Sequence, residues 1–271
     1  MLSTFFNNDA SNVGDWRLKK HSEEKFWEFV GTWAVMIRSP QDIGFSGDGF
    51  VLPEKTTETI LIEDDSARDT LFSMPASGLS EVRKSQRITP ESRCRKTAEI
   101  VNSDINSQWL IWCQYNDEGD LLERLIPDSV QISGSDSDEH KERSVIDFAE
   151  GKIRILITKT KIAGFGVNWQ SCHNMIFCGL SFSYESFYQA IRRCWRFGQK
   201  NNVNIYIISS EKEVSTIEAI KKKELQHENM NNNIYNSIKS FFNFKNMESE
   251  YSEEIVKGED FTAIMGDSVE E

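Results

Sequence analysis

Short apolar runs alternate with amphipathic segments along the middle of the chain. The runs are four to six residues long and rich in β-branched and aromatic residues, which is typical of buried strands. They occupy residues 59–62, 109–113, 129–132, 153–157, 174–178 and 203–208. Between them, apolar residues recur every three or four positions, which predicts helices over residues 93–102, 119–125, 136–149 and 184–195. We therefore expect an α/β fold, a doubly wound parallel sheet with flanking helices, and ligands at the carboxyl ends of its strands.

The two ends of the chain differ from this alternating middle. Residues 24–38 carry aromatic and apolar positions at helical spacing, and Ser39-Pro40 ends that pattern. A polar, arginine-rich connector over residues 81–95 indicates a domain boundary. A charged helix over residues 213–242 is expected to pack back on the sheet, and the chain beyond Met247 is acidic and poorly patterned.

The net charge of the chain hides an uneven distribution. Its 271 residues contain 31 Lys+Arg and 43 Asp+Glu, a formal net charge of −12 that argues against a nucleic-acid partner. Between Lys152 and Lys200, however, eight basic residues stand against the single acid Glu185, a local charge of +7, and the rest of the chain sums to −19. A basic island in an acidic chain indicates one specific polyanion site.

Several classes of protein are not indicated. The five cysteines are scattered without a CxxC pair, so we expect buried thiols and neither a disulfide framework nor a metal site. No apolar run approaches the ~20 residues that a membrane span needs, and the N-terminus lacks the layout of a signal peptide. The sequence predicts an unexported, cytoplasmic protein without a membrane partner.

Two acidic segments imitate the Mg²⁺-binding DExD/H motif of nucleotide hydrolases. Asp117-Glu118-Gly119-Asp120 does not directly follow a strand, and Asp138-Glu139-His140 follows a Ser/Gly loop. Both fit better as acids in the first turn of a helix. The sequence also contains no GxxxxGK[ST], so it has no phosphate-binding P-loop of its own.

The strongest chemical signal lies in residues 189–199, QAIRRCWRFGQ. On a helix, Arg193 and Arg196 face the same side, and Gln189 lies one turn before Arg193. Guanidinium groups suit the planar recognition of phosphate. A solvated helix face is the ordinary explanation for such a segment, but no nearby acid in the sequence pairs with these arginines.

Four segments together resemble the C-terminal RecA-like lobe of superfamily 2 helicases, of the Swi/Snf type and closest to phage-encoded DEAD/DEAH-like helicases. Residues 109–123 resemble motif IV, and residues 131–152 resemble the strand, Gly-Ser loop and helix that follow it. Residues 160–168 resemble motif V and residues 189–199 resemble motif VI, QAxxRxxRxGQ. Arg192 and Trp195 depart from chromatin-remodelling relatives, which usually carry an acid and a histidine there.

The resemblance implies a division of labour between two lobes. ATP and Mg²⁺ would be held mainly by a P-loop lobe, in cis or in trans, while this lobe closes on the γ-phosphate. Arg196 is then expected to be the arginine finger, Arg193 a second phosphate contact and Gln189 their positioning partner, with Gly164 and Gly166 near the nucleotide.

The same resemblance implies contacts to nucleic acid. Those contacts are expected from Gln114, Ser133, Thr160 and Lys161. Phosphate contacts carry no sequence information, as a translocating motor requires. DNA is the expected polymer, with RNA as an alternative.

The resemblance also suggests a domain organisation. Residues 1–53 look like the end of an N-terminal lobe whose motifs I to III would precede Met1, and residues 54–92 form a connector. The helicase C-terminal RecA-like domain is expected over residues 93–210, followed by a helix over residues 211–246. An acidic tail, or the start of a further domain, occupies residues 247–271.

The leading hypothesis is the C-terminal lobe of an ATP-dependent DNA helicase or translocase, a hydrolase that turns over only with a P-loop lobe. It would act in the cytoplasm of a bacterium or of a phage-infected host cell. The alternative is a non-catalytic nucleic-acid-binding or partner-binding module derived from such a lobe. An unrelated α/β enzyme ranks last.

Overall fold

The computed structural model describes residues 2–8, 16–34, 36–62, 90–163, 166–181, 183–210 and 213–241. The chain divides into two compact units. The larger unit runs from Val51 to Leu225, and the smaller one is formed by described residues up to Phe50 and from Gln226 onwards.

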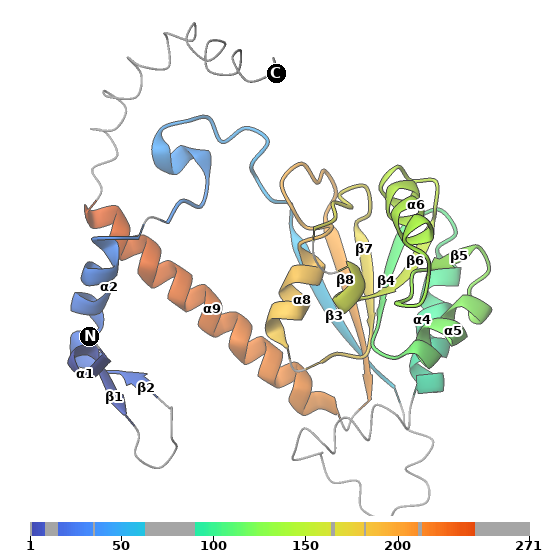
Figure 1. The fold of residues 1–271 in the computed structure, drawn as a ribbon, viewed down its shortest axis with the longest axis horizontal. Helices are drawn as coiled ribbons and strands as arrows, with labels where there is room; N and C mark the ends of the chain where they lie inside the picture. The colour runs from blue at the N-terminus through green and yellow to red at the C-terminus, as the bar shows by residue number, and fades with distance from the viewer. Residues whose placement is uncertain are drawn as a thin grey trace, which may run out of the picture. The chain divides into compact units, whose positions relative to one another are not determined.

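Six parallel strands form the sheet of the larger unit, in the order β3-β8-β7-β4-β6-β5 (Figure 1). The strands are β3 (Lys55–Ile62), β4 (Trp109–Cys113), β5 (Ser129–Gln131), β6 (Ile155–Lys159), β7 (Asn174–Cys178) and β8 (Val203–Ser210). The helices are α4 (Pro90–Ser103), α5 (Asn116–Leu125), α6 (Asp138–Ala149), α7 (Thr160–Ala163), α8 (Tyr184–Ile191) and α9 (Val214–Phe241). The predicted α/β fold, a doubly wound parallel sheet with flanking helices, is confirmed.

The apolar runs form strands because helices bury both faces of the sheet. In β4, Trp109, Ile111 and Cys113 belong to one hydrophobic cluster, and Leu110 and Trp112 belong to a second cluster on the opposite face. Residues of α4 and α5 complete the first cluster, whereas residues of α6, α8 and the start of α9 complete the second. Helices α4 and α5 accordingly lie on one side of the sheet and α8 on the other (Figure 1).

Strand β3 lies within residues 54–92, the range that the sequence suggested as a connector. It pairs in parallel with β8 along its whole length, from Lys55 opposite Val203 to Ile62 opposite Ser210. The larger unit therefore includes an edge strand from upstream of α4. Residues 63–89 of the expected connector lie outside the described residues.

The predicted helix over residues 184–195 is wrong in its last turn. Helix α8 ends at Ile191, with Arg192 as its C-cap. Beyond it the chain follows tight turns, in which the carbonyl of Arg193 accepts a hydrogen bond from the Trp169 backbone N–H. This bond to a neighbouring loop replaces a continued helical bond, and no local sequence pattern reveals it.

The charged helix predicted over residues 213–242 is present as α9, and its first part packs against the sheet. Ile217 and Ile220 belong to the core of the larger unit. From Gln226 onwards α9 belongs to the smaller unit. There the Arg38 guanidinium donates to the Asn231 carbonyl at 2.7 Å, and the Tyr235 hydroxyl donates to Asp42.

The rest of the smaller unit consists of short elements. They are α1 (Leu2–Phe5), β1 (Phe6–Asn8), β2 (Trp16–Leu18), α2 (Glu23–Gly31) and the 3₁₀ helices Lys20–Ser22 and Pro40–Ile43. The helix predicted over residues 24–38 thus ends early, because Gly31 is a poor helix former and the Thr32 hydroxyl bonds the Phe29 carbonyl at 2.7 Å.

The structure also bears on the cysteines and on membrane association. All five cysteines are buried free thiols, as the sequence predicts. Among the described residues, no helix is long and apolar enough to cross a membrane.

Candidate functional site

Residues 192–200, which we call the arginine segment, lie at the amino ends of the strands. The Gln199 side chain donates to the Cys172 carbonyl at 2.9 Å, two residues before β7. The Trp195 indole N–H donates to the Pro53 carbonyl at 2.8 Å, two residues before β3. These contacts place the segment at the edge of the sheet opposite the one where the fold class led us to expect ligands.

Arg193 is fixed by three hydrogen bonds. Its Nε donates to the Gln189 backbone carbonyl at 3.0 Å, and its Nη2 donates to the Gln189 side-chain Oε1 at 3.2 Å. Its Nη1 donates to the Val167 carbonyl at 2.9 Å. The structure thus brings Arg193 and Gln189 together, as the motif VI pattern suggests, and adds a contact to motif V.

The electrostatic surroundings of Arg193 disfavour its own charge. Burial, followed by the charges of Arg196 and Arg192, lowers the pKa of the Arg193 guanidinium. Arg196 makes no hydrogen bond or ion pair with the residues that the structure describes, and its side chain is half-buried. A cluster of guanidinium groups without a carboxylate favours an anion, because an anion relieves their mutual repulsion.

The motif V segment connects the two edges of the sheet. Thr160 and Lys161 open α7, directly after the carboxyl end of β6. Six residues later the Val167 carbonyl reaches Arg193 at the amino edge. Gly166 has a positive φ of 82°, a conformation that glycine adopts without strain. Gly164, predicted to lie near the nucleotide, is outside the described residues.

Three of the four predicted nucleic-acid contacts follow neighbouring strands. Gln114 comes directly after β4 and Thr160 directly after β6, and these strands pair so that Cys113 faces Lys159. The Gln114 side-chain Nε2 is buried and has no hydrogen-bond partner in the described part of the chain. Lys161 is exposed. The carboxyl edge of the sheet therefore brings together an amide donor, a hydroxyl and an ammonium group.

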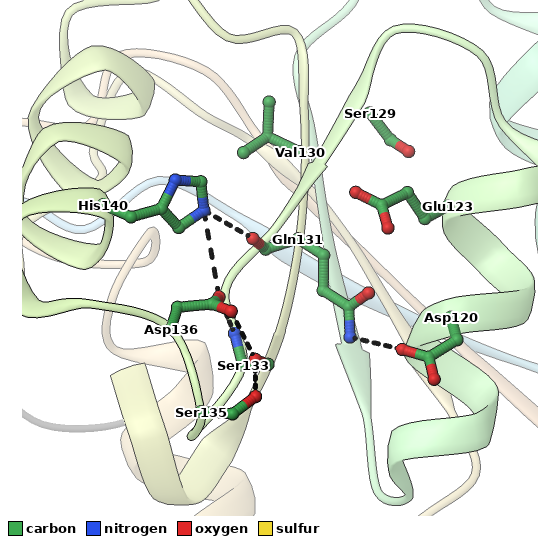
Figure 2. A pocket seen from close by; sticks show the side chains of 9 residues that line it. All are labelled: Asp120, Glu123, Ser129, Val130, Gln131, Ser133, Ser135, Asp136 and His140. Atoms are coloured by element: carbon green, nitrogen blue, oxygen red, sulfur yellow. Dashed lines mark hydrogen bonds and ion pairs between the residues drawn. The ribbon is translucent and has the colours of Figure 1, made fainter.

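The fourth predicted contact, Ser133, lies in acidic surroundings. Its hydroxyl donates to Asp136 at 2.7 Å, and its backbone N–H donates to the same carboxylate at 2.7 Å. Figure 2 shows these residues in an open pocket of about 510 Å³ between α5, β5 and α6, which Asp120 and Glu123 also line. Three carboxylates repel phosphate, so these surroundings do not favour a phosphate contact at Ser133.

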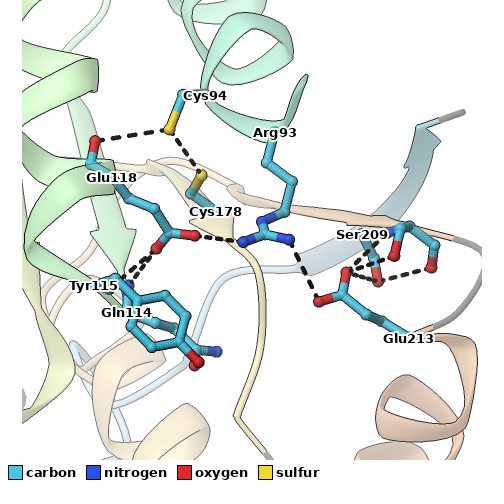
Figure 3. A network of polar contacts seen from close by, with 9 residues as sticks. Arg93, Cys94, Gln114, Tyr115, Glu118, Cys178, Ser209 and Glu213 are labelled. Carbon is cyan, nitrogen blue, oxygen red and sulfur yellow. Dashed lines mark hydrogen bonds and ion pairs between the residues drawn. The ribbon is translucent and has the colours of Figure 1, made fainter. Parts of the chain in front are cut away.

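A buried ion-pair network supports the carboxyl edge (Figure 3). Arg93, on α4, lies 2.5 Å from a Glu118 carboxylate oxygen and 3.5 Å from a Glu213 carboxylate oxygen. The other Glu118 oxygen accepts the backbone N–H groups of Gln114 and Tyr115 at 2.9 and 3.1 Å. Glu118 is therefore a helix-start acid, as the sequence indicates, and it also shapes the loop that carries Gln114.

Sequence patterns miss Arg93 and Val167 as parts of these sites. Arg93 is separated from Glu118 by 25 residues and from Glu213 by 120, so no local spacing signals the network. Val167 contributes only a backbone carbonyl, which does not depend on its side chain.

The donor groups present fit a phosphate better than a metal ion. Arg193 and Arg196 supply guanidinium groups for phosphate oxygens. Among the described residues, no group of three or more His, Cys, Asp or Glu side chains could hold a metal ion.

Part of the chain is similar in sequence to known proteins. Residues 92–198 match the family model "Helicase conserved C-terminal domain". The chain is 27% identical over 172 residues to the TATA-binding protein-associated factor mot1 of Schizosaccharomyces pombe, covering 54% of this chain and 9% of that protein. It is 25% identical over 131 residues to the ATP-dependent DNA helicase DDM1 of Arabidopsis thaliana, covering 45% of this chain and 17% of that protein.

A solved structure is also similar. The C-terminal part of the Fun30 ATPase domain matches with a TM-score of 0.43 and 25% identity, covering 50% of this chain and 46% of that one. The chain thus spans less than half of each of these proteins.

Residues 92–198, less than half of the chain, are homologous to the C-terminal domains of superfamily 2 helicases of the Swi/Snf type. The expected closeness to phage-encoded helicases is not supported by the two curated relatives above, which come from a yeast and a plant.

Proposed function

We propose that the chain acts as the C-terminal lobe of an ATP-dependent DNA helicase or translocase. The observation that carries this proposal is the arginine segment, in which Arg193 is fixed to Val167 and Gln189 while Arg196 lies beside it without a carboxylate partner among the described residues. Arginines supplied across a cleft stabilise the charge that develops on a transferred phosphoryl group.

Three side chains of motif VI each take one role in this proposal. Arg196 is the arginine finger, Arg193 is a second phosphate contact, and Gln189 positions Arg193. Gly164 and Gly166 lie near the nucleotide. ATP would supply the phosphoryl group and Mg²⁺ would neutralise its oxygens. Both would be held by a P-loop lobe in cis or in trans, because this sequence has no P-loop.

DNA is the proposed second ligand. Gln114, Thr160 and Lys161 would contact its phosphates at the carboxyl edge, and Ser133 is the weakest member of this set because of the nearby carboxylates. Motif V spans from this edge to Arg193, so a shift of motif V on nucleotide binding would reach both ligands.

The test is DNA-stimulated ATP hydrolysis by the chain together with a P-loop helicase lobe. Arg196→Ala is expected to lower kcat by about 10³-fold or more, the value of an arginine finger. Arg95→Ala is the matched control, because it removes an exposed arginine from α4 that pairs only with Glu91 in the described contacts. An unchanged kcat for Arg196→Ala contradicts the arginine-finger role.

The alternative function, a non-catalytic binding module, rests on the absence of a P-loop and of DExD/H acids from this sequence. It predicts that the unaltered chain binds DNA but does not increase hydrolysis by any P-loop lobe.

A further inference from the structure

Aromatic rings and cations form a cluster on the arginine segment that phosphate recognition does not need. The Arg192 guanidinium carbon lies 5.4 Å from the centroid of the Trp195 ring and 5.8 Å from that of the Phe197 ring. The Lys55 ammonium lies 5.1 Å from the Trp195 centroid. We call Arg192, Trp195 and Phe197 the aromatic platform.

The platform is held firmly in place. The Trp195 indole N–H is bound to the Pro53 carbonyl, so this ring is fixed to the residues before β3. Gly198 has a φ of 91°, and a Cβ there would meet the Gln170 side chain at 3.0 Å. Gln199, which is buried, bonds the Cys172 and Cys194 carbonyls. These contacts fix the chain on both sides of Phe197.

The neighbouring charges distinguish Phe197 from an ordinary surface aromatic residue. Phe197 leaves 37% of its surface exposed, next in sequence to Arg196. Lys55 is neutralised by Glu224 at 2.8 Å, but Arg192 makes no ion pair with the described residues. An exposed ring flanked by uncompensated guanidinium groups matches the chemistry of nucleobase binding, in which a base stacks on an aromatic ring and cations bind its phosphate.

We propose that Phe197, backed by Arg192, is a stacking surface for a nucleobase whose phosphate is bound by Arg196. The proposal rests on the proposed function, because it places a phosphate at Arg196. The shared ligand chemistry is a base linked to a phosphate, which a free nucleotide and a single-stranded nucleic acid both offer.

The test compares ligands that carry a base with ligands that lack one. One pair is a thymidine oligonucleotide of about 12 nucleotides and an abasic oligonucleotide of the same length, and the other pair is ATP and inorganic tripolyphosphate. Affinities of the full 271-residue chain are measured by titration for the unaltered protein, Phe197→Leu and Phe197→Trp. Phe45→Leu is the matched control, since Phe45 is also exposed but lies in the smaller unit.

The proposal is supported if Phe197→Leu lowers the affinity for the base-containing ligand about tenfold in one of the two pairs only. One base–aromatic stack contributes about that much to affinity. The pair that responds identifies the source as single-stranded nucleic acid or as nucleotide. Phe197→Trp is expected to keep the preference, and Phe45→Leu to leave it unchanged.

The proposal is overturned if Phe197→Leu retains the full preference for the base, or if the unaltered chain shows no preference in either pair. Failure of the proposed function has a different readout. In that case Arg196→Ala leaves the affinity for the base-free ligands, tripolyphosphate and the abasic oligonucleotide, unchanged.

Discussion

Arg93 and Arg193 are both fixed by hydrogen bonds, but the charges around them are opposite. Arg93 is fully buried at the carboxyl edge of the sheet, where Glu118 and Glu213 outweigh the cost of burial and raise the pKa of its guanidinium. Arg193 is half-buried at the amino edge, where burial and two further arginines lower the pKa of its guanidinium.

Under the proposed function, this contrast separates a structural arginine from a ligand-binding one. The charge of Arg93 is balanced within the fold, so an added anion gains nothing there. The charges of Arg193 and Arg196 repel each other, so an anion bound there would relieve this repulsion. Three experiments test this distinction.

The largest expected effect is that of Arg93→Met on stability. Removing this guanidinium leaves two buried glutamates without their counter-ion, which is expected to lower the free energy of unfolding by about 3–5 kcal/mol in urea titrations. The control is Arg95→Met on the same helix, an exposed position with an expected change within about 0.5 kcal/mol. A loss below about 1 kcal/mol for Arg93→Met would mean that Arg93 is not structurally required.

A smaller effect is expected from replacing the two motif VI arginines by lysine. Arg193→Lys loses the bonds that three separate guanidinium nitrogens make to Gln189 and Val167, and an ammonium group cannot span them. The free energy of unfolding should fall by about 1–2 kcal/mol, compared with about 0.5 kcal/mol or less for Arg196→Lys. If the two variants lower the free energy of unfolding equally, Arg193 is not held more firmly by the fold than Arg196.

The sequence predicts the fold well where the pattern is local. The run over residues 109–113 becomes β4 and that over residues 174–178 becomes β7 with unchanged bounds, because both faces of these strands are buried and apolar. The acids at Asp117 and Glu118 do lie in the first turn of α5. These features depend on neighbours within a few residues.

The candidate site is less accessible to sequence reasoning because its contacts are long-range. Helical spacing predicts that Arg193 and Arg196 share a helix face, but α8 has already ended at Ile191. The Val167 carbonyl and the Trp169 N–H take over the contacts of Arg193 instead. The rule that ligands bind at the carboxyl edge likewise leaves out the arginine segment, whose position is set by bonds to Pro53 and Cys172.

The smallest expected effect is on the salt dependence of DNA binding. If Arg196 contacts a DNA phosphate in addition to, or instead of, the nucleotide, Arg196→Ala should reduce the slope of log K against log salt by about 0.9 for duplex DNA. If Arg196 serves only the nucleotide, the slope should stay unchanged while tripolyphosphate binding falls.

The control for the salt experiment lies inside the same basic island. Lys152 is paired with Glu150 at 2.5 Å and with Asp147 at 3.2 Å, so Lys152→Ala should leave the slope as it is. A lower slope for Lys152→Ala as well would mean that the local charge of +7 attracts DNA as a whole. Cations with and without a carboxylate partner would then contribute alike to DNA binding. The difference in charge balance between Arg93 and Arg193 would not predict which arginine binds a ligand.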